Sequence, residues 1–185
     1  MTRTATNLWD LTKKVGRQIW RKASGGKSGV GDTAGGGYRL TWLDENIATG
    51  YAPISRDDLK AVKAQGIDAI VNLCGEFCDL QDLQKDSGFE VYYLPIPDEC
   101  APDMMQIDAA LDWIEQAVDR GKKILVHCRF GIGRTGTVAI AYLLRKGLSL
   151  KAAEKALRKT GARPSNYSQW RLLRTYARQQ ATRGR

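Results

Sequence analysis

The chain has 185 residues, 43% of them apolar, which is enough to bury the core of one sizeable domain and leave an extension. Four Cys and one His are too few for a secreted disulfide framework or a Cys/His zinc site, so we expect free thiols and neither metal nor other cofactor. No apolar run approaches the length of a membrane span and the N-terminus lacks an apolar signal core, so we expect a cytoplasmic protein.

The formal net charge of +9 is distributed unevenly. Residues 1–37 and 145–185 are rich in Lys and Arg, whereas residues 38–144 are net negative. Two basic ends suit phosphorylated or otherwise anionic partners, although solvated surface charge explains the pattern equally well. Nucleic acid is not an expected partner, because the chain has no RNA-binding motif and no set of aromatic residues for base stacking.

Residues 1–24 are predicted to form a basic amphipathic helix, because apolar residues recur at helical spacing and basic residues lie mostly elsewhere on the wheel. The helix either lies on an anionic membrane surface, which would make the protein peripheral at the membrane, or packs against protein. The apolar residues are Leu8, Leu11, Val15 and Ile19, and the basic ones are Lys13, Lys14, Arg17, Arg21 and Lys22.

Residues 25–37, GGKSGVGDTAGGG, are Gly-rich without apolar periodicity, which predicts a flexible linker. The stretch superficially resembles a Walker phosphate loop. A basic helix rather than a strand precedes it, however, and the Walker spacing is absent, so we expect no nucleotide site there.

Strands alternate with helices through residues 38–182, which form the predicted catalytic domain. This alternation predicts an α/β fold, with a central, largely parallel sheet flanked by helices. Ser55 and Asp103 are the expected N-caps of two of the helices. Expected strands cover residues 38–44, 47–51, 68–74, 89–96 and 123–127, and expected helices cover 55–65, 80–85, 104–118 and segments beginning at 135, 149 and 166.

The stretch HCRFGIGRTG, residues 127–136, lies between a buried strand and a helix, where open α/β sheets bind their ligands. The amides of residues 129–135 can turn inward around a tetrahedral oxyanion, and the Gly residues permit the backbone angles that this requires. These amides, the N-terminus of the following helix and Arg134 favour the thiolate form of Cys128. Cys128 is therefore the predicted nucleophile.

His127-Cys128, five residues and Arg134-Thr135 match the signature of the cysteine-dependent protein tyrosine phosphatases. Residues 38–180 resemble the dual-specificity branch, whose small three-layer domains lack long insertions. The resemblance implies that Thr135 stabilises the departing thiolate and that His127 orients the loop and helps to set the thiol's acidity. The implied phosphate-binding residues are Arg129, Phe130, Gly131, Ile132, Gly133 and Arg134.

Phosphoryl transfer to a thiolate leaves an alkoxide or phenoxide that needs a proton, so a carboxylic acid should lie above the loop. The stretch PIPDECAPD resembles the general-acid loop of this family, and Asp98 is the expected acid. Glu99 and Asp103 are the alternatives, with Asp103 better suited to capping the following helix. The implied reaction forms a cysteinyl-phosphate that water hydrolyses with Asp98 as base, and it needs no metal.

Two further segments resemble parts of this superfamily. In RKTGARPSNYSQW, Arg163 would contact substrate phosphate and Gln169 would place the hydrolytic water, although Gln169 is also explained as a surface residue of a basic helix. In VNLCGEFCD, Cys74 occupies the place of the resolving Cys of phosphatase-and-tensin-type enzymes. Cys78 is the rival thiol, and Cys74 is also explained as a small buried apolar residue.

The composition of the loop bears on the substrate. Phosphoinositide phosphatases of the family usually place Lys on both sides of the first loop Gly, whereas this chain has one basic residue, Arg129. We therefore expect phosphorylated protein substrates, phosphotyrosine foremost and phosphoserine and phosphothreonine besides. The alternatives are a lipid phosphate, such as phosphatidylglycerophosphate or a phosphoinositide, and a non-catalytic module that binds phosphorylated groups or RNA.

If the N-terminal helix lies on membranes, deleting residues 1–24 should lower binding to vesicles that contain anionic phospholipid by at least about tenfold, because each basic residue at such a surface contributes roughly 1 kcal/mol. Vesicle sedimentation of the full and shortened chains measures the difference, with neutral phosphatidylcholine vesicles as the control. Equal binding of the two chains to anionic vesicles would exclude the membrane role.

Overall fold

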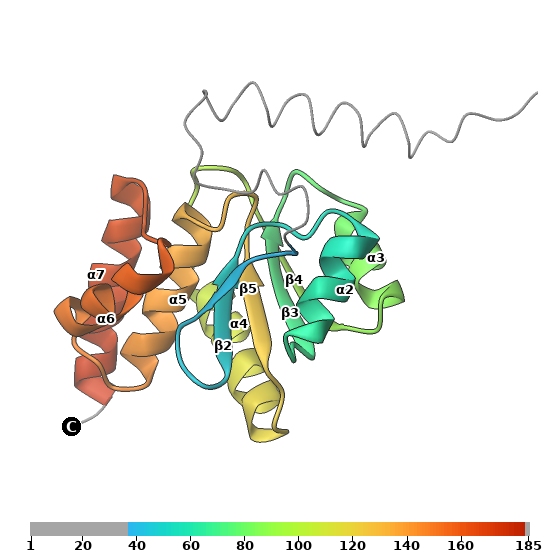
Figure 1. Ribbon diagram of the computed structural model, residues 1–185. Coiled ribbons are helices and arrows are strands. Elements are labelled where there is room, and N and C mark those ends of the chain that lie inside the picture. The colour runs from blue at the N-terminus through green and yellow to red at the C-terminus, as the bar shows by residue number, and fades with distance from the viewer. Residues whose placement is uncertain (1–36, 184–185) are drawn as a thin grey trace, which may run out of the picture. The chain divides into compact units, whose positions relative to one another are not determined.

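The computed structural model describes residues 37–183, so the predicted N-terminal helix and all of the predicted linker except Gly37 lie outside the described residues. Between residues 37 and 183 no helix has both the length and the apolar character needed to cross a membrane. Strands and helices alternate through this range, as predicted (Figure 1). In chain order the elements are β1 (Leu40–Trp42), β2 (Ile47–Gly50), α2 (Arg56–Ala64), β3 (Ala69–Cys74), α3 (Leu80–Asp86), β4 (Glu90–Ile96), α4 (Met104–Asp119), β5 (Ile124–His127), α5 (Gly133–Arg145), α6 (Leu150–Leu157), a short 3-10 turn (Arg158–Thr160) and α7 (Tyr167–Arg183).

The five strands form one sheet in the order β1-β2-β5-β3-β4. β1 is antiparallel to β2, and every other neighbouring pair is parallel, so the prediction of a largely parallel sheet is confirmed. His127, the last residue of β5, lies opposite Gly50 of β2 on one side and Asn72 of β3 on the other. The loop after β5 therefore leaves the sheet between the carboxyl ends of two parallel neighbours, the usual ligand-binding edge of an α/β sheet.

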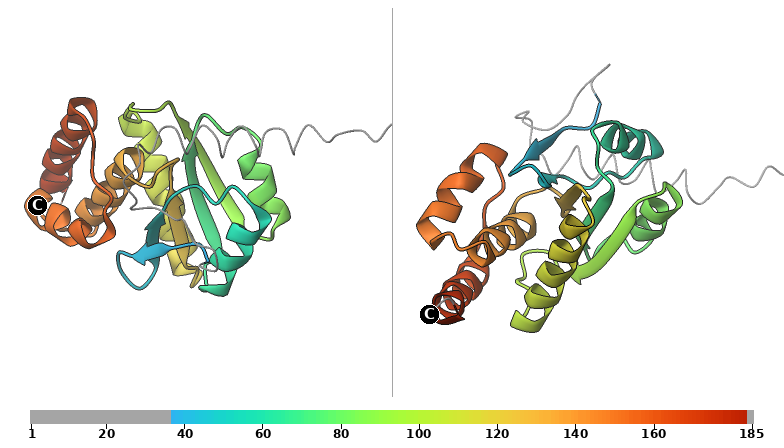
Figure 2. Two further views of the ribbon diagram at one scale, coloured as in Figure 1. Left: turned by 45° about the horizontal axis from the view of Figure 1, so that its top comes forward. Right: turned by 90° about the horizontal axis from the view of Figure 1, so that it is seen from below.

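Helices cover both faces of the sheet (Figure 2). α2 and α3 enclose one core cluster, in which Leu59 and Leu83 pack with Ile70 of the sheet. α4 and α5 enclose the other, in which Ile114 and Ile140 are completely buried. α6 and α7 pack on α5, so α5 is almost entirely buried, and full burial of each large apolar side chain contributes roughly 1.5–3 kcal/mol.

Local sequence signals explain where most helices begin. Ser55 caps α2 in a reciprocal arrangement with Asp58, and Asp103 caps α4 in the same way with Gln106, so both predicted N-caps are confirmed. α3 is one exception, because its N-cap residue, Asp79, makes no side-chain hydrogen bond. α5 is the other, because it begins at Gly133, two residues before the predicted start. Its N-cap position, Ile132, makes no side-chain hydrogen bond, since the loop backbone itself turns into the helix.

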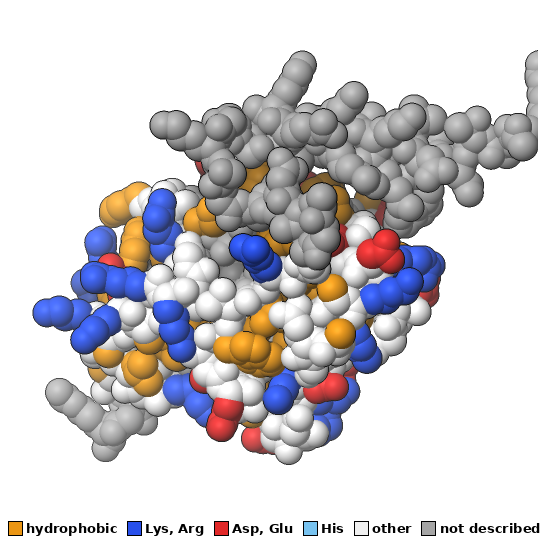
Figure 3. Space-filling view, in the orientation of Figure 1, with side chains coloured by type: hydrophobic (Ala, Val, Ile, Leu, Met, Phe, Trp, Pro, Cys, Tyr) orange, Lys and Arg blue, Asp and Glu red, His pale blue; other side chains and the backbone are white. Residues whose placement is uncertain are grey.

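The basic C-terminal segment forms a coherent part of the surface. Lys and Arg side chains gather over α6 and α7 (Figure 3). The exposed basic residues of α6, the 3-10 turn and α7 are Lys151, Lys155, Arg158, Lys159, Arg171, Arg174 and Arg178.

Candidate active site

Cys128 directly follows β5 and is 3% exposed, at the base of the loop that leads into α5. Glycine lets this loop lie against its neighbours at two points. A Cβ atom on Gly131, whose φ is 71°, would lie 2.5 Å from the carbonyl oxygen of Gly50, and one on Gly136 would lie 2.5 Å from backbone atoms of Arg163. The loop thus takes its shape from the end of β2 on one side and from the segment before α7 on the other.

Arg134 is the most heavily contacted polar side chain of the loop. Its guanidinium pairs with both carboxylate oxygens of Glu76, at 2.7 Å each, and with Oδ1 of Asp98 at 2.9 Å. Nη1 also donates to the carbonyl oxygens of Leu73 and Ile96, at 3.3 and 2.8 Å. The Arg134 side chain is 2% exposed, so these contacts hold a buried cation at the carboxyl edge of the sheet.

The charges around Arg134 are mutually dependent. Burial lowers the pKa of Arg134, but its hydrogen bonds to Glu76 and the negative charges of Cys128, Glu76 and Asp98 outweigh burial and raise that pKa above its ordinary value. Burial raises the pKa of Glu76, and the hydrogen bonds from Arg134 reverse this and leave that pKa below its usual range. Both groups are therefore charged at neutral pH, and removing either one strands the other as a poorly solvated charge.

Glu76 is the residue of this site that sequence reasoning missed. Nothing local distinguishes it, because it follows β3 whereas Arg134 lies in α5, and only the packing of the sheet brings the two together.

Of the three acidic candidates, Asp98 is the one for which an ion pair with Arg134 is seen among the described residues. Its side chain is 54% exposed, so it stands at the mouth of the site. Asp103 caps α4, as predicted, with its carboxylate accepting from the amide of Gln106 at 2.8 Å. Glu99 adopts a positive φ of 58° and is exposed.

His127 belongs to a buried chain of hydrogen bonds behind the loop. The amide of Cys74 donates to Oδ1 of Asn72 at 2.9 Å, Nδ2 of Asn72 donates to Oε1 of Gln84 at 3.1 Å, and Nε2 of Gln84 lies 2.8 Å from Nε2 of His127. The backbone amide of Cys74 can only donate, so Oδ1 of Asn72 faces it and Nδ2 of Asn72 faces Gln84. Nε2 of Gln84 therefore donates to Nε2 of His127, which leaves the imidazole proton on Nδ1.

The His127 ring is neutral at physiological pH. Burial lowers its pKa to about 3, against a smaller raising effect of a hydrogen bond with the backbone of Cys128. Nδ1 lies 3.8 Å from Sγ of Cys74. A neutral, fully buried imidazole suits the predicted orienting role and does not suit a proton carrier.

Thr135 and the predicted loop residues complete the base of the site. The Thr135 hydroxyl is buried and makes no hydrogen bond within residues 37–183, which leaves it free to interact with a group at Cys128. Phe130 and Ile132 are 37% and 40% exposed and form an apolar part of the loop surface. The guanidinium carbon of Arg129 lies 4.9 Å from the ring centroid of Phe130, within reach of a cation–π interaction.

Arg163 and Gln169, the two residues predicted from the segment after the loop, differ in burial. Arg163 has an exposed side chain, and its backbone packs against Gly136. Gln169 is completely buried, so the alternative that makes it a surface residue is wrong. Its Oε1 accepts from the amide of Ser165 at 2.8 Å, and its Nε2 donates to the carbonyl of Cys100 at 3.1 Å.

All four cysteines are free thiols, as expected from their number and spacing. Cys74 ends β3, which pairs with β5 as predicted, and its side chain is buried in the cluster under α2 and α3. Cys128 belongs to the cluster on the opposite face, and Cys78 and Cys100 are exposed. Burial, and after it the charges of Glu76 and Cys128, raises the pKa of the Cys74 thiol well above its ordinary value, so Cys74 is protonated at neutral pH.

The chain resembles several known phosphatases. A family model described as "Polymorphic toxin system, DSP-PTPase phosphatase" matches residues 48–148. The chain is 30% identical over 120 residues to the phosphatidylglycerophosphate phosphatase PTPMT2 of Arabidopsis thaliana, covering 63% of this chain and 52% of that protein. It is 34% identical over 123 residues to the dual specificity protein phosphatase PHS1 of the same plant, covering 65% of this chain and 13% of that protein.

Among solved structures, Tk-PTP in its active form superposes with a TM-score of 0.68 and is 33% identical, covering 75% of this chain and 96% of that chain. The match spans nearly all of that smaller chain, whereas this chain spans about half or less of the two curated relatives.

Mild acid should destabilise the fold because of His127, the one His in the chain. The unfolded chain binds a proton near pH 6.5, whereas the folded chain keeps the ring neutral down to about pH 3. The contribution of His127 to the free energy of unfolding is therefore complete above pH 6.5. It is lost as the pH falls, by about 2 kcal/mol between pH 7 and pH 5. Urea unfolding followed by Trp fluorescence at several pH values measures this loss.

A His127→Asn variant is the matched control, because it lacks the titrating ring. Its unfolding free energy should be nearly constant between pH 7 and pH 5. The carboxylate of Glu76, whose pKa is lowered, contributes only at pH values below this window. Equal pH dependence in the two proteins would show that His127 is not the group responsible.

Proposed function

We propose that this chain, which belongs to the DSP-PTPase family in the dual-specificity branch of the cysteine-dependent protein tyrosine phosphatases, hydrolyses phosphate monoesters through a cysteinyl-phosphate on Cys128. One observation carries the proposal. A buried Cys directly after β5, a buried Arg in the first turn of α5 and an acid from the loop after β4 converge at one edge of the sheet. This is the arrangement that nucleophilic displacement at phosphorus requires.

In the first step, the Cys128 thiolate attacks phosphorus as the bond to the leaving oxygen breaks. Arg134 and the loop amides stabilise the negative charge on the three non-bridging oxygens. Nη2 of Arg134 is shared with the half-exposed Asp98, and an incoming phosphate can take the place of that contact. Asp98, freed in this way beside the leaving oxygen, gives it a proton.

In the second step, water attacks the cysteinyl-phosphate, Asp98 accepts a proton from that water, and the S–P bond breaks to release inorganic phosphate. The departing thiolate needs a hydrogen-bond donor, and the buried, otherwise unbonded hydroxyl of Thr135 supplies one. Neutral His127 keeps the base of the loop in place throughout.

Phosphotyrosine proteins are the proposed substrates. Phe130 and Ile132 expose apolar surface on the loop, and such surface suits contact with a phenyl ring. The exposed position of Asp98 indicates a site open enough for the shorter side chains of phosphoserine and phosphothreonine as well.

A lipid phosphomonoester is the second candidate. The observation that favours it is the 30% identity to PTPMT2, whose name gives phosphatidylglycerophosphate as its substrate. The apolar loop surface at Phe130 and Ile132 is compatible with this substrate too. Assays of a phosphotyrosyl peptide beside phosphatidylglycerophosphate in detergent micelles distinguish the two, because the preferred substrate will have the higher kcat/KM.

Replacing the catalytic groups should abolish or sharply reduce turnover. We expect no measurable phosphate release from Cys128→Ser, and a loss of about 10²–10⁴-fold in kcat for Asp98→Asn, the usual contribution of a general acid. The Asp98→Asn variant should also lose the pH dependence that reports this acid. Release of phosphate from a phosphotyrosyl peptide, with vanadate as inhibitor, measures each effect.

Two matched controls separate chemistry from general damage. Cys78→Ser makes the same atomic change at an exposed thiol, and Asp103→Asn keeps an equally good helix cap. Both should retain activity within about twofold of the unmodified protein. Phosphate release by Cys128→Ser at an appreciable rate would rule out the covalent mechanism.

We also propose that peroxide inactivates the enzyme reversibly through a disulfide between Cys128 and Cys74. Peroxide oxidises the Cys128 thiolate to a sulfenic acid, which Cys74 then attacks, so that the S–S bond forms and water leaves. Cys74 ends β3, the strand that pairs with β5, but the two side chains lie in core clusters on opposite faces of the sheet, so the bridge requires them to approach each other after Cys128 is oxidised.

Dithiothreitol should restore most of the activity of the peroxide-treated protein but little of the activity of Cys74→Ser, whose Cys128 proceeds to irreversible oxidation. Cys78→Ser, which removes the rival thiol, should recover like the unmodified protein. Activity before and after dithiothreitol, with peptide mapping of the bridge, provides the measurement. Equal recovery in all three proteins would refute the bridge.

A further inference from the structure

We propose that Asn166 and Gln169, at the start of α7, are positioning residues that hold Asp98 in its place beside Arg134. They do so by hydrogen bonding to the backbone of the loop after β4, residues 97–103, here called the acid loop. The role deepens the proposed function, because it assigns to the C-terminal helix the control of the general acid.

The acid loop begins with a tight turn that projects Asp98. The amide of Cys100 donates to the carbonyl of Pro97 at 3.0 Å, which closes a four-residue turn with Asp98 and Glu99 at its centre. Glu99 has a φ of 58° in the third position of that turn, where a positive φ normally calls for Gly. A non-Gly residue in this conformation is strained, so contacts from outside the turn are needed to hold it.

Two side chains of α7 supply such contacts. Nδ2 of Asn166 donates to the carbonyl of Glu99 at 2.5 Å, and Nε2 of Gln169 donates to the carbonyl of Cys100 at 3.1 Å. The two carbonyls are consecutive, and both belong to the turn that carries Asp98. We refer to this pair of hydrogen bonds as the clasp.

Both donors are themselves fixed. Oδ1 of Asn166 accepts from the amide of Gln169 at 3.1 Å and from the hydroxyl of Ser168 at 2.7 Å, so the amide group is oriented with Nδ2 toward the acid loop. Gln169 is completely buried and holds Ser165 through Oε1. It also lies beside the phosphate-binding loop, because a Cβ on Gly133 would come within 3.2 Å of its amide nitrogen.

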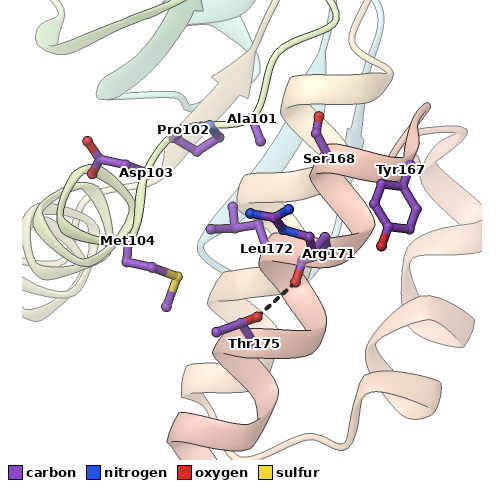
Figure 4. A pocket seen from close by; sticks show the side chains of 9 residues that line it. All are labelled: Ala101, Pro102, Asp103, Met104, Tyr167, Ser168, Arg171, Leu172 and Thr175. Carbon is purple, nitrogen blue, oxygen red and sulfur yellow. Dashed lines mark hydrogen bonds between the residues drawn. The ribbon is translucent and has the colours of Figure 1, made fainter.

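Beyond the clasp the acid loop and α7 separate. A groove of about 450 Å³ opens between Ala101 and Pro102 on one side and Ser168, Arg171 and Leu172 on the other (Figure 4). The acid loop is therefore not packed against α7 along its whole length, and the clasp is the link between them at the turn. If the clasp is lost, the strained turn can relax, and Asp98, which the turn carries, can move away from Arg134.

The sharpest test is Asn166→Ser. Asn166 caps α7 by accepting from the amide of Gln169. Serine is as good an N-cap as asparagine, so α7 should still begin at the same residue, but the serine hydroxyl is too short to reach the carbonyl of Glu99. Asp98 acts as acid in the first step and as base in the second, and kcat/KM isolates the first because it covers only the steps up to formation of the cysteinyl-phosphate. We expect kcat/KM to fall about tenfold for phosphotyrosine, a smaller loss than the roughly 10²–10⁴-fold typical for removal of a general acid.

The choice of substrate separates positioning from structural damage. For an aryl phosphate with strongly electron-withdrawing substituents, whose phenolate departs without a proton, kcat/KM should fall by less than about threefold. Inhibition by vanadate should stay unchanged, because the phosphate-binding loop is intact.

The matched control is Gln179→Ser, which makes a similar change at an exposed position of the same helix. It should behave like the unmodified protein in every measurement. Equal losses of kcat/KM for the two substrates, or unchanged kcat/KM for phosphotyrosine in Asn166→Ser, would overturn the positioning role. A second variant, Gln169→Met, removes the donor to Cys100 with a side chain of similar size and adds no charge beside the phosphate-binding loop, and it should show the same selective loss.

A readout independent of activity distinguishes failure of the clasp from failure of the proposed function. Hydrogen–deuterium exchange of the backbone amides in residues 97–103 should be at least about tenfold faster in Asn166→Ser than in the unmodified protein and unchanged in Gln179→Ser. If the unmodified protein releases no phosphate from any substrate, this measurement still tests the clasp. Identical exchange in all three proteins would overturn it.

Discussion

The buried guanidinium of Arg134 is the constraint on which the rest of the structure depends. It joins the first turn of α5 to the backbone at the ends of β3 and β4, to Glu76 and to Asp98. A cation that is 2% exposed is tolerable only when its charge and its hydrogens are satisfied, and its partners come from two segments, one at the end of β3 and the other at the end of β4. The carboxyl edge of the sheet therefore has to be assembled around this one side chain.

Behind the loop, a neutral chain of amides and imidazole provides rigidity without charge. Asn72, Gln84 and His127 are fully buried, and each polar group that links them has a partner. A satisfied network of this kind fixes a single arrangement, whereas a partly satisfied one would be costly. The base of the phosphate loop is thus held from behind by hydrogen bonds, and from the front by the ion pairs of Arg134.

The two sides of the site differ in how firmly they are held. The phosphate loop is enclosed between β2, α5 and the segment before α7, where even a Cβ at Gly131 or Gly136 would collide with backbone. The acid loop is more exposed and contains a strained turn. This difference suits a reaction in which phosphate binding needs a preformed cradle, whereas the acid has to exchange its contact with Arg134 for a contact with substrate.

The sequence by itself determined the order of strands and helices, the parallel sheet, two helix caps and the residues of the phosphate loop, because all of these depend on periodicity or on short contiguous motifs. It also pointed to Asp98, through a local resemblance. Only the tertiary structure decided that Glu76 pairs with Arg134, that Gln169 is buried and that Asn166 reaches the acid loop. These contacts join segments far apart in the chain, and which segments meet is determined by the packing of the sheet and α7, which no local pattern encodes.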